Sequence, residues 1–183
     1  MSTPIPLAIF ASGTGTNFRA IMEAATRGEL GAAEPVCLVV NKQCPAIAIA
    51  EEYQLPVLDY SPELELPENV LIALAGFMKI LPASFVHRFE NRILNLHPSI
   101  LPAYPGLNSI ARAFTDGVDS GCTVHLVDEG MDTGPILAQS HIQYNPQESL
   151  AEFEQRIHAA EHQLFPEIIR NYSLQLQKQE GTK

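Results

Sequence analysis

The sequence has no tryptophan, three cysteines and few positive charges. Eleven lysines and arginines stand against 21 aspartates and glutamates, which gives a formal net charge of −10. Nucleic acids and anionic membranes are bound by an excess of lysine and arginine, so this balance argues against both as the main partner. No window approaches the ~20 apolar residues of a membrane span. The first 17 residues lack the cationic start and long apolar region of a secretion signal, so we expect a cytoplasmic protein.

The cysteines Cys37, Cys44 and Cys122 are odd in number and have no metal-ligand spacing. Two of them lie in or beside apolar runs, so we expect buried free thiols in a reducing compartment. The length of 183 residues suits one domain, 1–183, which would bury about 70% of its unfolded surface.

Short apolar runs rich in β-branched residues alternate with longer amphipathic ones, which is typical of an α/β protein with a mostly parallel sheet. Continuous hydrophobicity in several runs indicates strands that helices cover on both faces. The predicted strands are 7–10, 36–40, 56–60, 70–75, 92–96, 122–127 and 135–144. The predicted helices are 17–26, 45–53, 82–89, 107–116 and about 147–171.

One connection breaks the alternation. From Tyr60 to Asn69 the chain reads "YSPELELPEN", which is too short and too rich in proline for the crossover helix that parallel strands normally need. We therefore expect an extended segment there and no helix after the third strand. The sheet face beneath it would be less well covered, so an oligomer contact is predicted at this place and the protein is expected to be a monomer or a homodimer.

A turn of small residues, "ASGTGTN", follows the first predicted strand and leads directly into a helix. Gly13 and Gly15 would let the backbone approach a ligand, the hydroxyls of Ser12, Thr14 and Thr16 would add donors, and the helix would supply free N–H groups. This arrangement favours phosphate binding. A plain tight turn between strand and helix uses the same residues and remains the alternative.

Asn95 and His97 stand at the end of the fifth predicted strand, in "ILNLHPSILPAYPG". Ligands of open α/β sheets bind beyond the carboxyl ends of the strands, so this pair would share an end of the sheet with the glycine turn. Residues i and i+2 of a strand point the same way, and the prolines that follow restrict the loop. A structural role for a lone histidine is the alternative.

Three carboxylates follow the sixth predicted strand in "VHLVDEGMDTGP": Asp128, Glu129 and Asp132. We expect this strand to end at the same edge of the sheet, so that one carboxylate reaches His97 and forms an acid–base pair. A solvated turn is the alternative. Because these loops offer no cysteine or serine nucleophile and no metal-ligand cluster, the predicted chemistry is acid–base catalysis with oxyanion stabilisation.

Four motifs, "SGTGTN", "LAGFMKIL", "NLHPSILPAYPG" and "GCTVHLVDEGMDTGPIL", resemble the phosphoribosylglycinamide formyltransferase family in order and over nearly the whole chain. The resemblance implies a Rossmann-like open sheet of seven strands with helices on both faces, in a single formyltransferase domain. It also implies direct transfer of a formyl group from the co-substrate 10-formyltetrahydrofolate to the amine of glycinamide ribonucleotide in purine biosynthesis, with small molecules as partners and no metal.

The resemblance also assigns roles to residues. His97 would be the catalytic acid–base, Asn95 would donate to the oxyanion, and Asp132 would pair with His97 and help to order the water that relays protons. The glycinamide ribonucleotide would be held by Gly15, Thr16, Asn17, His158 and Glu161. The folate would contact Met78, Lys79, Ile80, Leu81, Asn95, Val127, Asp128, Glu129, Gly130, Met131 and Asp132.

The segment "PAYPGLNSIARAF" resembles the mobile loop that closes over the reactants in this family, which would expel water. Two departures concern the glutamate tail of the folate: the missing helix usually carries an arginine, and Lys79 stands where an arginine is common. Bidentate recognition of a carboxylate is thereby reduced to a point charge.

Other functions remain open. A methionyl-tRNA formyltransferase would need a further RNA-binding domain and a basic surface, whereas this chain is acidic. A formyltetrahydrofolate hydrolase is expected to have a different first turn, and a sugar N-formyltransferase a nucleotide-sugar cleft. A non-catalytic protein that binds a phosphorylated metabolite is the alternative from another class.

Overall fold

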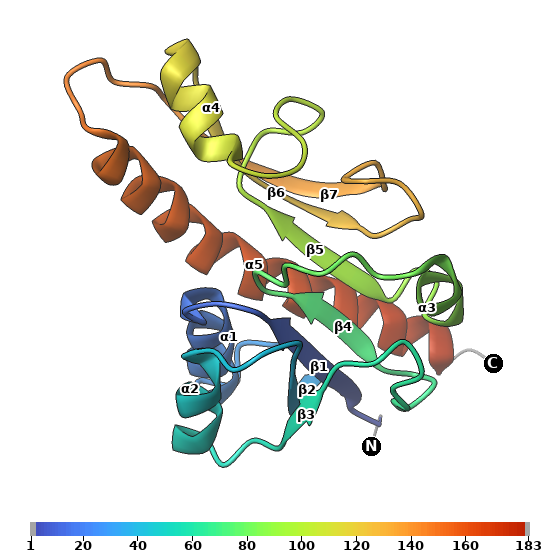
Figure 1. Ribbon diagram of the computed structural model, residues 1–183. Helices are drawn as coiled ribbons and strands as arrows, with labels where there is room; N and C mark the ends of the chain where they lie inside the picture. The colour runs from blue at the N-terminus through green and yellow to red at the C-terminus, as the bar shows by residue number, and fades with distance from the viewer. Residues whose placement is uncertain (1–2, 182–183) are drawn as a thin grey trace.

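A computed structural model describes residues 3–181, which form one seven-stranded sheet with helices on both faces (Figure 1). The strands lie in the order β3-β2-β1-β4-β5-β6-β7. This confirms the predicted α/β sheet and all seven predicted strands. The strands are β1 (Ile5–Ala11), β2 (Ala33–Val40), β3 (Val57–Asp59), β4 (Leu71–Leu74), β5 (Ile93–His97), β6 (Ser120–Leu126) and β7 (Ile136–Ile142).

The five predicted helices are also present, and the last is longer than predicted. It continues to Glu180 because Ser173 and Leu176, beyond the clear apolar stripe, are buried against the sheet side of the molecule. The hydroxyl of Ser173 accepts from the N–H of Ala32 and donates to the carbonyl of Leu30. The helices are α1 (Thr16–Thr26), α2 (Ala46–Glu52), α3 (Ala83–Arg88), α4 (Ser109–Asp116) and α5 (Leu150–Glu180).

The sheet is parallel from β3 to β5 and antiparallel at β6 and β7. Asn95 of β5 lies opposite His125 of β6. The carboxyl end of β6 therefore lies beside the amino end of β5. The expectation that β6 ends at the same edge as β5 is wrong, because β6 enters the sheet in the opposite direction.

Two apolar layers cover the sheet. Residues of α1, α2 and α5 pack on one face, and α3 packs on the other. A smaller cluster of Ile110, Phe153 and Ile157 joins α4 to the first turns of α5. Figure 1 shows α4 at one end of the molecule, beside this part of α5 and beyond the ends of the strands.

No helix occurs between β3 and β4, as predicted. The residues 60–69 run along the sheet as an irregular segment, and Leu64 and Leu66 pack against the α3 face. Tyr60 adds to a group of aromatic rings with Phe77 and Phe85. These contacts take over part of the burial that a crossover helix would provide. An oligomer contact at this segment stays a prediction.

Cys37 and Cys122 are buried, as expected, and Cys44 is half-buried. Burial raises the pKa of the Cys37 thiol to about 11 and that of Cys122 to about 12. Both groups are therefore protonated at neutral pH and chemically inert.

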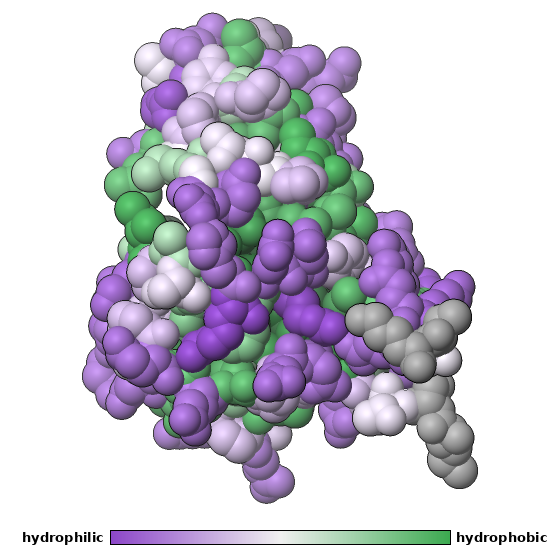
Figure 2. All heavy atoms as spheres, turned by 90° about the vertical axis from the view of Figure 1, so that its right-hand side faces the viewer, coloured by the Kyte–Doolittle hydropathy of each residue, from purple (hydrophilic) through white to green (hydrophobic). Residues whose placement is uncertain are grey.

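Figure 2 shows one side of the surface, on which hydrophilic side chains surround smaller hydrophobic areas. Among the helices of residues 3–181, none combines the length and the apolar character that crossing a membrane requires.

Candidate active site

The candidate site lies at the point where the strand order changes direction. The chain runs from β1 to β2 on one side and later returns to β4 on the other, so the loops after β1 and β4 diverge there. A cavity of about 520 Å³ opens at these strand ends. Its walls include the glycine turn, the segment after β4, the end of β5 and part of α5.

The glycine turn leaves the start of α1 without a side-chain cap. Gly15 is the N-cap residue, capping by a side chain is absent among residues 3–181, and the first turn has no acidic residue. The free N–H groups and the positive end of the helix dipole therefore face the cavity region and suit an anion. Phosphate binding at this turn stays a prediction.

The two glycines of the turn have different roles. Gly15 has φ +78°, and a Cβ there would come within 2.9 Å of Ala46 and Ile49 on α2. A Cβ at Gly13 would meet nothing within 4 Å. Gly15 is thus needed for the left-handed turn and for the close approach of α2, whereas the space beside Gly13 is open to a ligand.

Ser12 is a structural residue, contrary to the expectation that its hydroxyl serves a ligand. It is buried, its hydroxyl donates to Asn41 Oδ1 at 2.6 Å, and the N–H of Met78 donates to it at 2.8 Å. The hydroxyl ties the ends of β1, β2 and β4 together. Thr14 and Thr16 do line the cavity.

A buried carboxylate closes the side of the cavity next to α1. Glu161 of α5 is 3% exposed, and its Oε2 accepts from Asn17 Nδ2 and from His158 Nδ1, each at 2.9 Å. The hydrogen bond to Glu161 raises the pKa of His158. The buried Oδ1 of Asn17 has no hydrogen-bond partner among residues 3–181 and is open to a donor. The structure thus brings together three residues to which the family resemblance assigns one ligand, glycinamide ribonucleotide.

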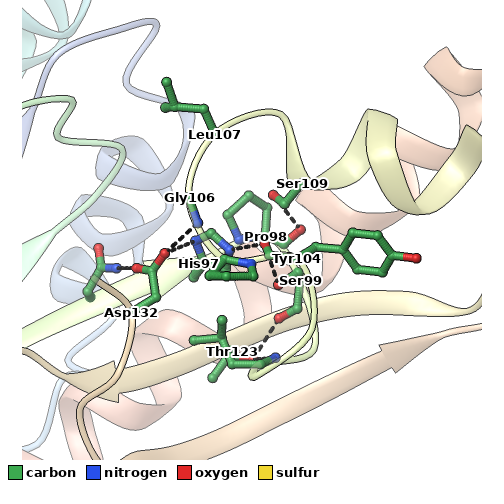
Figure 3. Close-up of polar contacts among 12 residues, drawn as sticks. His97, Pro98, Ser99, Tyr104, Gly106, Leu107, Ser109, Thr123 and Asp132 are labelled. Atoms are coloured by element: carbon green, nitrogen blue, oxygen red, sulfur yellow. Dashed lines mark hydrogen bonds and ion pairs between the residues drawn. The ribbon is translucent and has the colours of Figure 1, made fainter. Parts of the chain in front are cut away.

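His97 is buried at the end of β5, between two acceptor groups. Its Nε2 lies 3.0 Å from the carbonyl oxygen of Tyr104, and its Nδ1 lies 3.5 Å from Asp132 Oδ2. A carbonyl oxygen can only accept, so the hydrogen of that bond is on Nε2. Figure 3 shows the imidazole between Asp132 on one side and the backbone of Tyr104 on the other. The predicted pairing of His97 with a carboxylate is present, and the carboxylate is Asp132.

The Asp132 carboxylate is held in its ionised form. The buried His125 beside it and the N–H of Gly106, which donates to Oδ2 at 2.8 Å, lower the pKa of Asp132 to about 2, and His97 contributes to the same effect. An ionised carboxylate therefore faces His97 Nδ1, a geometry that suits general acid–base chemistry at this nitrogen.

Asn95 points to the same side of the strand as His97, as its spacing predicts. Its Nδ2 lies 3.0 Å from His125 Nε2 and 3.4 Å from Asp132 Oδ1. His125 Nδ1 donates to the carbonyl of Leu126 at 2.9 Å, and its Nε2 also lies 3.6 Å from Asp132 Oδ1. The amide nitrogen of Asn95 therefore lies beside both His125 and Asp132.

His125 is a site residue that sequence reasoning missed. The alternation of "CTVHLV" places it on one face of a strand. Its position opposite Asn95 depends on the antiparallel register of β5 and β6, which the sequence does not show.

Asp132 reaches the site although β6 ends at the far edge, because the 127–135 loop turns back along β5. The N–H of Val127 donates to the carbonyl of Ile93, at the amino end of β5. A Cβ at Gly134 would come within 1.8 Å of the Leu126 carbonyl, so only glycine allows the chain to pass there. Asp128 bonds to Gly130 N and Thr133 Oγ1 and stabilises the turn.

Apolar side chains surround the opposite part of the cavity. Met78 and Ile80 follow β4 and are 69% and 79% exposed, and Leu107 and Met131 are 76% and 60% exposed. Such exposure of large apolar groups around one opening is typical of a binding site. Lys79 lies over the ring of Tyr60, 5.2 Å from its centroid.

Part of the predicted folate set lies elsewhere. Leu81 and Val127 pack in the core, and neither they nor Asp128, Glu129 and Gly130 line the cavity. Glu129 instead contacts His87 of α3. Contacts of these five residues with a folate stay predictions.

This chain is similar to known proteins in both sequence and structure. The profile of a family described as formyl transferase matches residues 6–169. The phosphoribosylglycinamide formyltransferase of Bacillus subtilis (strain 168) is 38% identical over 179 residues, covering 89% of this chain and 92% of that protein. The protein of the same name from Haemophilus influenzae is 36% identical, over 90% of this chain and 85% of that protein. The crystal structure of glycinamide ribonucleotide transformylase 1 from Geobacillus kaustophilus superimposes with a TM-score of 0.84 at 38% identity, over 92% of this chain and 98% of that one.

Proposed function

The chain belongs to the formyl transferase family, and from this we propose that it transfers the formyl group of 10-formyltetrahydrofolate to the amine of glycinamide ribonucleotide in purine biosynthesis. The observation that carries the proposal is the meeting of Asn95, His97 and Asp132 in one cavity, with the uncapped start of α1 at its other end. We also propose that residues 1–183 act as one formyltransferase domain in the cytoplasm.

The nucleotide is proposed to lie between α1 and α5. Its phosphate is bound at the N–H groups that follow Gly15, with Thr16 and Asn17 beside them. A buried carboxylate repels a phosphate, so Glu161 and His158 suit the ribose hydroxyls better than the phosphate itself. This refines the expectation that both residues hold the glycinamide ribonucleotide.

The folate is proposed to enter past the exposed apolar residues Met78, Ile80 and Met131, which cover its rings. The formyl carbon then lies beside Asn95 and His97. Lys79 offers a single positive charge near this entrance for the carboxylates of the glutamate tail.

In the reaction, the amine nitrogen attacks the formyl carbon and the carbonyl oxygen becomes an oxyanion. Asn95 donates to this oxygen through the N–H that makes only a long 3.4 Å contact with Asp132. The attacking amine loses a proton to His97 Nδ1, where Asp132 stabilises it. The bond from the carbon to the folate nitrogen breaks, and that nitrogen takes the proton.

The proposal is tested by following 10-formyltetrahydrofolate, or its dideaza analogue, by absorbance with and without glycinamide ribonucleotide. We expect turnover only when the nucleotide is present. Turnover that ignores the nucleotide would assign a hydrolase instead, and binding without turnover would assign a non-catalytic protein.

The role of His97 is tested by His97→Ala. We expect turnover to be lost, because the amine has no group to receive its proton, while the nucleotide binds in calorimetry about as tightly as to the wild type. Near-normal turnover of His97→Ala would show that another group is the acid–base.

A further inference from the structure

The loop after β5 is attached to α4 by three side chains, Tyr104, Arg112 and Asp116, which we call the α4 clasp. The Tyr104 hydroxyl donates to Asp116 Oδ2 at 2.7 Å. The Arg112 guanidinium lies 5.4 Å from the centroid of the Tyr104 ring, and its Nη1 donates to the carbonyl of Pro105 at 2.8 Å. Figure 3 shows the Tyr104 ring extending away from His97 along α4.

The backbone that this clasp holds contacts both members of the acid–base pair. The carbonyl of Tyr104 accepts from His97 Nε2, and two residues later the N–H of Gly106 donates to Asp132 Oδ2. Tyr104 has φ +53°, a left-handed conformation that is unfavourable for an aromatic residue. The contacts of its side chain compensate for this conformation and keep the carbonyl directed at the imidazole.

The carbonyl has a chemical consequence for His97. Because it can only accept, it keeps the hydrogen on Nε2 and leaves Nδ1, which faces Asp132, to exchange a proton. If the carbonyl moved away, the neutral ring could place its hydrogen on either nitrogen. Only one of the two tautomers can take a proton at Nδ1.

We propose that Asp116 and Arg112 are positioning residues for the reaction, acting through Tyr104 to fix the orientation and tautomer of His97. The inference rests on the proposed function. It gives a positioning role to surface residues that contact neither substrate. Loss of the clasp is expected to lower kcat more than it changes KM for either substrate, because Tyr104, Arg112 and Asp116 do not themselves line the cavity.

The test is Tyr104→Phe, which removes the hydroxyl and keeps the ring. The matched control is Tyr172→Phe, which removes a hydroxyl that donates to the Asn91 carbonyl, also at 2.7 Å, on α5. We expect kcat of Tyr104→Phe to fall about 3- to 10-fold, since small displacements of catalytic groups have effects of this size or larger. The control should keep the wild-type kcat.

Substitutions of Asp116 complete the test. Asp116→Ala should lower kcat as much as Tyr104→Phe does. Asp116→Asn keeps an acceptor oxygen and should retain most of the wild-type kcat. The double variant Tyr104→Phe, Asp116→Ala should be no slower than either single variant if the two groups act as a unit. Unchanged kcat in Tyr104→Phe, or an equal loss in Tyr172→Phe, would overturn the inference.

A second measurement needs no substrate. The ¹⁵N chemical shifts of the His97 ring at about pH 8 report which nitrogen carries the hydrogen in the neutral form. We expect the Nε2–H form in the wild type and a mixture of forms in Tyr104→Phe. Identical shifts would contradict the positioning role even if kcat changed, and a wild type without turnover would contradict the proposed function while leaving this readout intact.

Discussion

The Asp132 carboxylate is the residue on which the site depends, because it contacts groups from three separate parts of the chain. His97 comes from β5, His125 from β6, and the N–H of Gly106 from the loop that follows β5. Asp132 itself has φ +55°, which is tolerated by aspartate better than by most residues. A small change at this one position therefore affects both the acid–base pair and the loop.

Asp132→Asn tests the charge of this residue through the pH dependence of stability. The pKa of Asp132 is lowered to about 2 from 3.8, so the ionised form stabilises the fold above about pH 3.8, and this contribution is lost as the pH falls toward 2. The full contribution corresponds to about 2 kcal/mol, of which roughly half is lost by about pH 3.

The measurement is urea unfolding of the wild type and of Asp132→Asn at about pH 5 and about pH 3. The difference in the free energy of unfolding between the two proteins should narrow by about 1 kcal/mol at the lower pH. A difference that stays constant would mean that Asp132 has an ordinary pKa.

At the scale of elements, the start of α1 is fixed by its approach to α2. The contact is so close at Gly15 that no side chain fits between the two helices. The same turn directs the free N–H groups of α1 toward the cavity, so helix packing and the proposed phosphate site share one residue.

Gly15→Ala tests this dual role, with Gly28→Ala as its control. Both glycines have similar positive φ, +78° and +70°, but a Cβ at Gly28 meets nothing within 4 Å. Gly28→Ala should lower the free energy of unfolding by about 1 kcal/mol, because alanine is unfavourable at this positive φ. Gly15→Ala should lower the free energy of unfolding by roughly 1–3 kcal/mol more than Gly28→Ala does, because its Cβ clashes with α2. It should also weaken nucleotide binding. Thermal or urea unfolding measures the stability, and calorimetry measures the nucleotide affinity. Equal stability and equal affinity of the two variants would show that Gly15 has no special role.

At the scale of the whole molecule, the missing crossover helix leaves the α3 face of the sheet to residues 60–69. The segment alternates, with Leu64 and Leu66 half-buried on the core and Glu63 and Glu65 exposed to solvent. A segment without a helix can therefore cover part of the core and remain hydrophilic outside.

The double variant Leu64→Ala, Leu66→Ala tests that covering role. Removing two partly buried leucine side chains should lower the free energy of unfolding by about 2–4 kcal/mol. The control Glu63→Ala, Glu65→Ala changes the exposed positions of the same segment and should shift it by less than about 1 kcal/mol. Urea unfolding of both double variants measures these changes. Similar decreases in the free energy of unfolding would mean that the two leucines do not protect the core.

Much of this protein follows from local patterns in its sequence. Runs of β-branched residues are typical of strands at any place in a fold, so all seven strands could be predicted, and so could the short link after β3. Asn95 and His97 point the same way because side chains two apart on a strand always do. The end of α5 could not be predicted, because Ser173 and Leu176 are buried by the tertiary structure and not by a clear apolar stripe.

The direction of β6 becomes apparent only in the folded structure. The hydrophobic pattern of one strand does not fix its direction or its register against the next strand, so the position of His125 opposite Asn95 could not be predicted. The position of β6 predicted that one of three carboxylates reaches His97, for a reason that proved wrong, and the family resemblance pointed to Asp132. Asp132 reaches His97 because the 127–135 loop folds back. The side chains capable of acid–base chemistry can be recognised from the sequence alone. How they meet depends on the tertiary structure, because their distances are set by strand direction and by loops that pack over long separations.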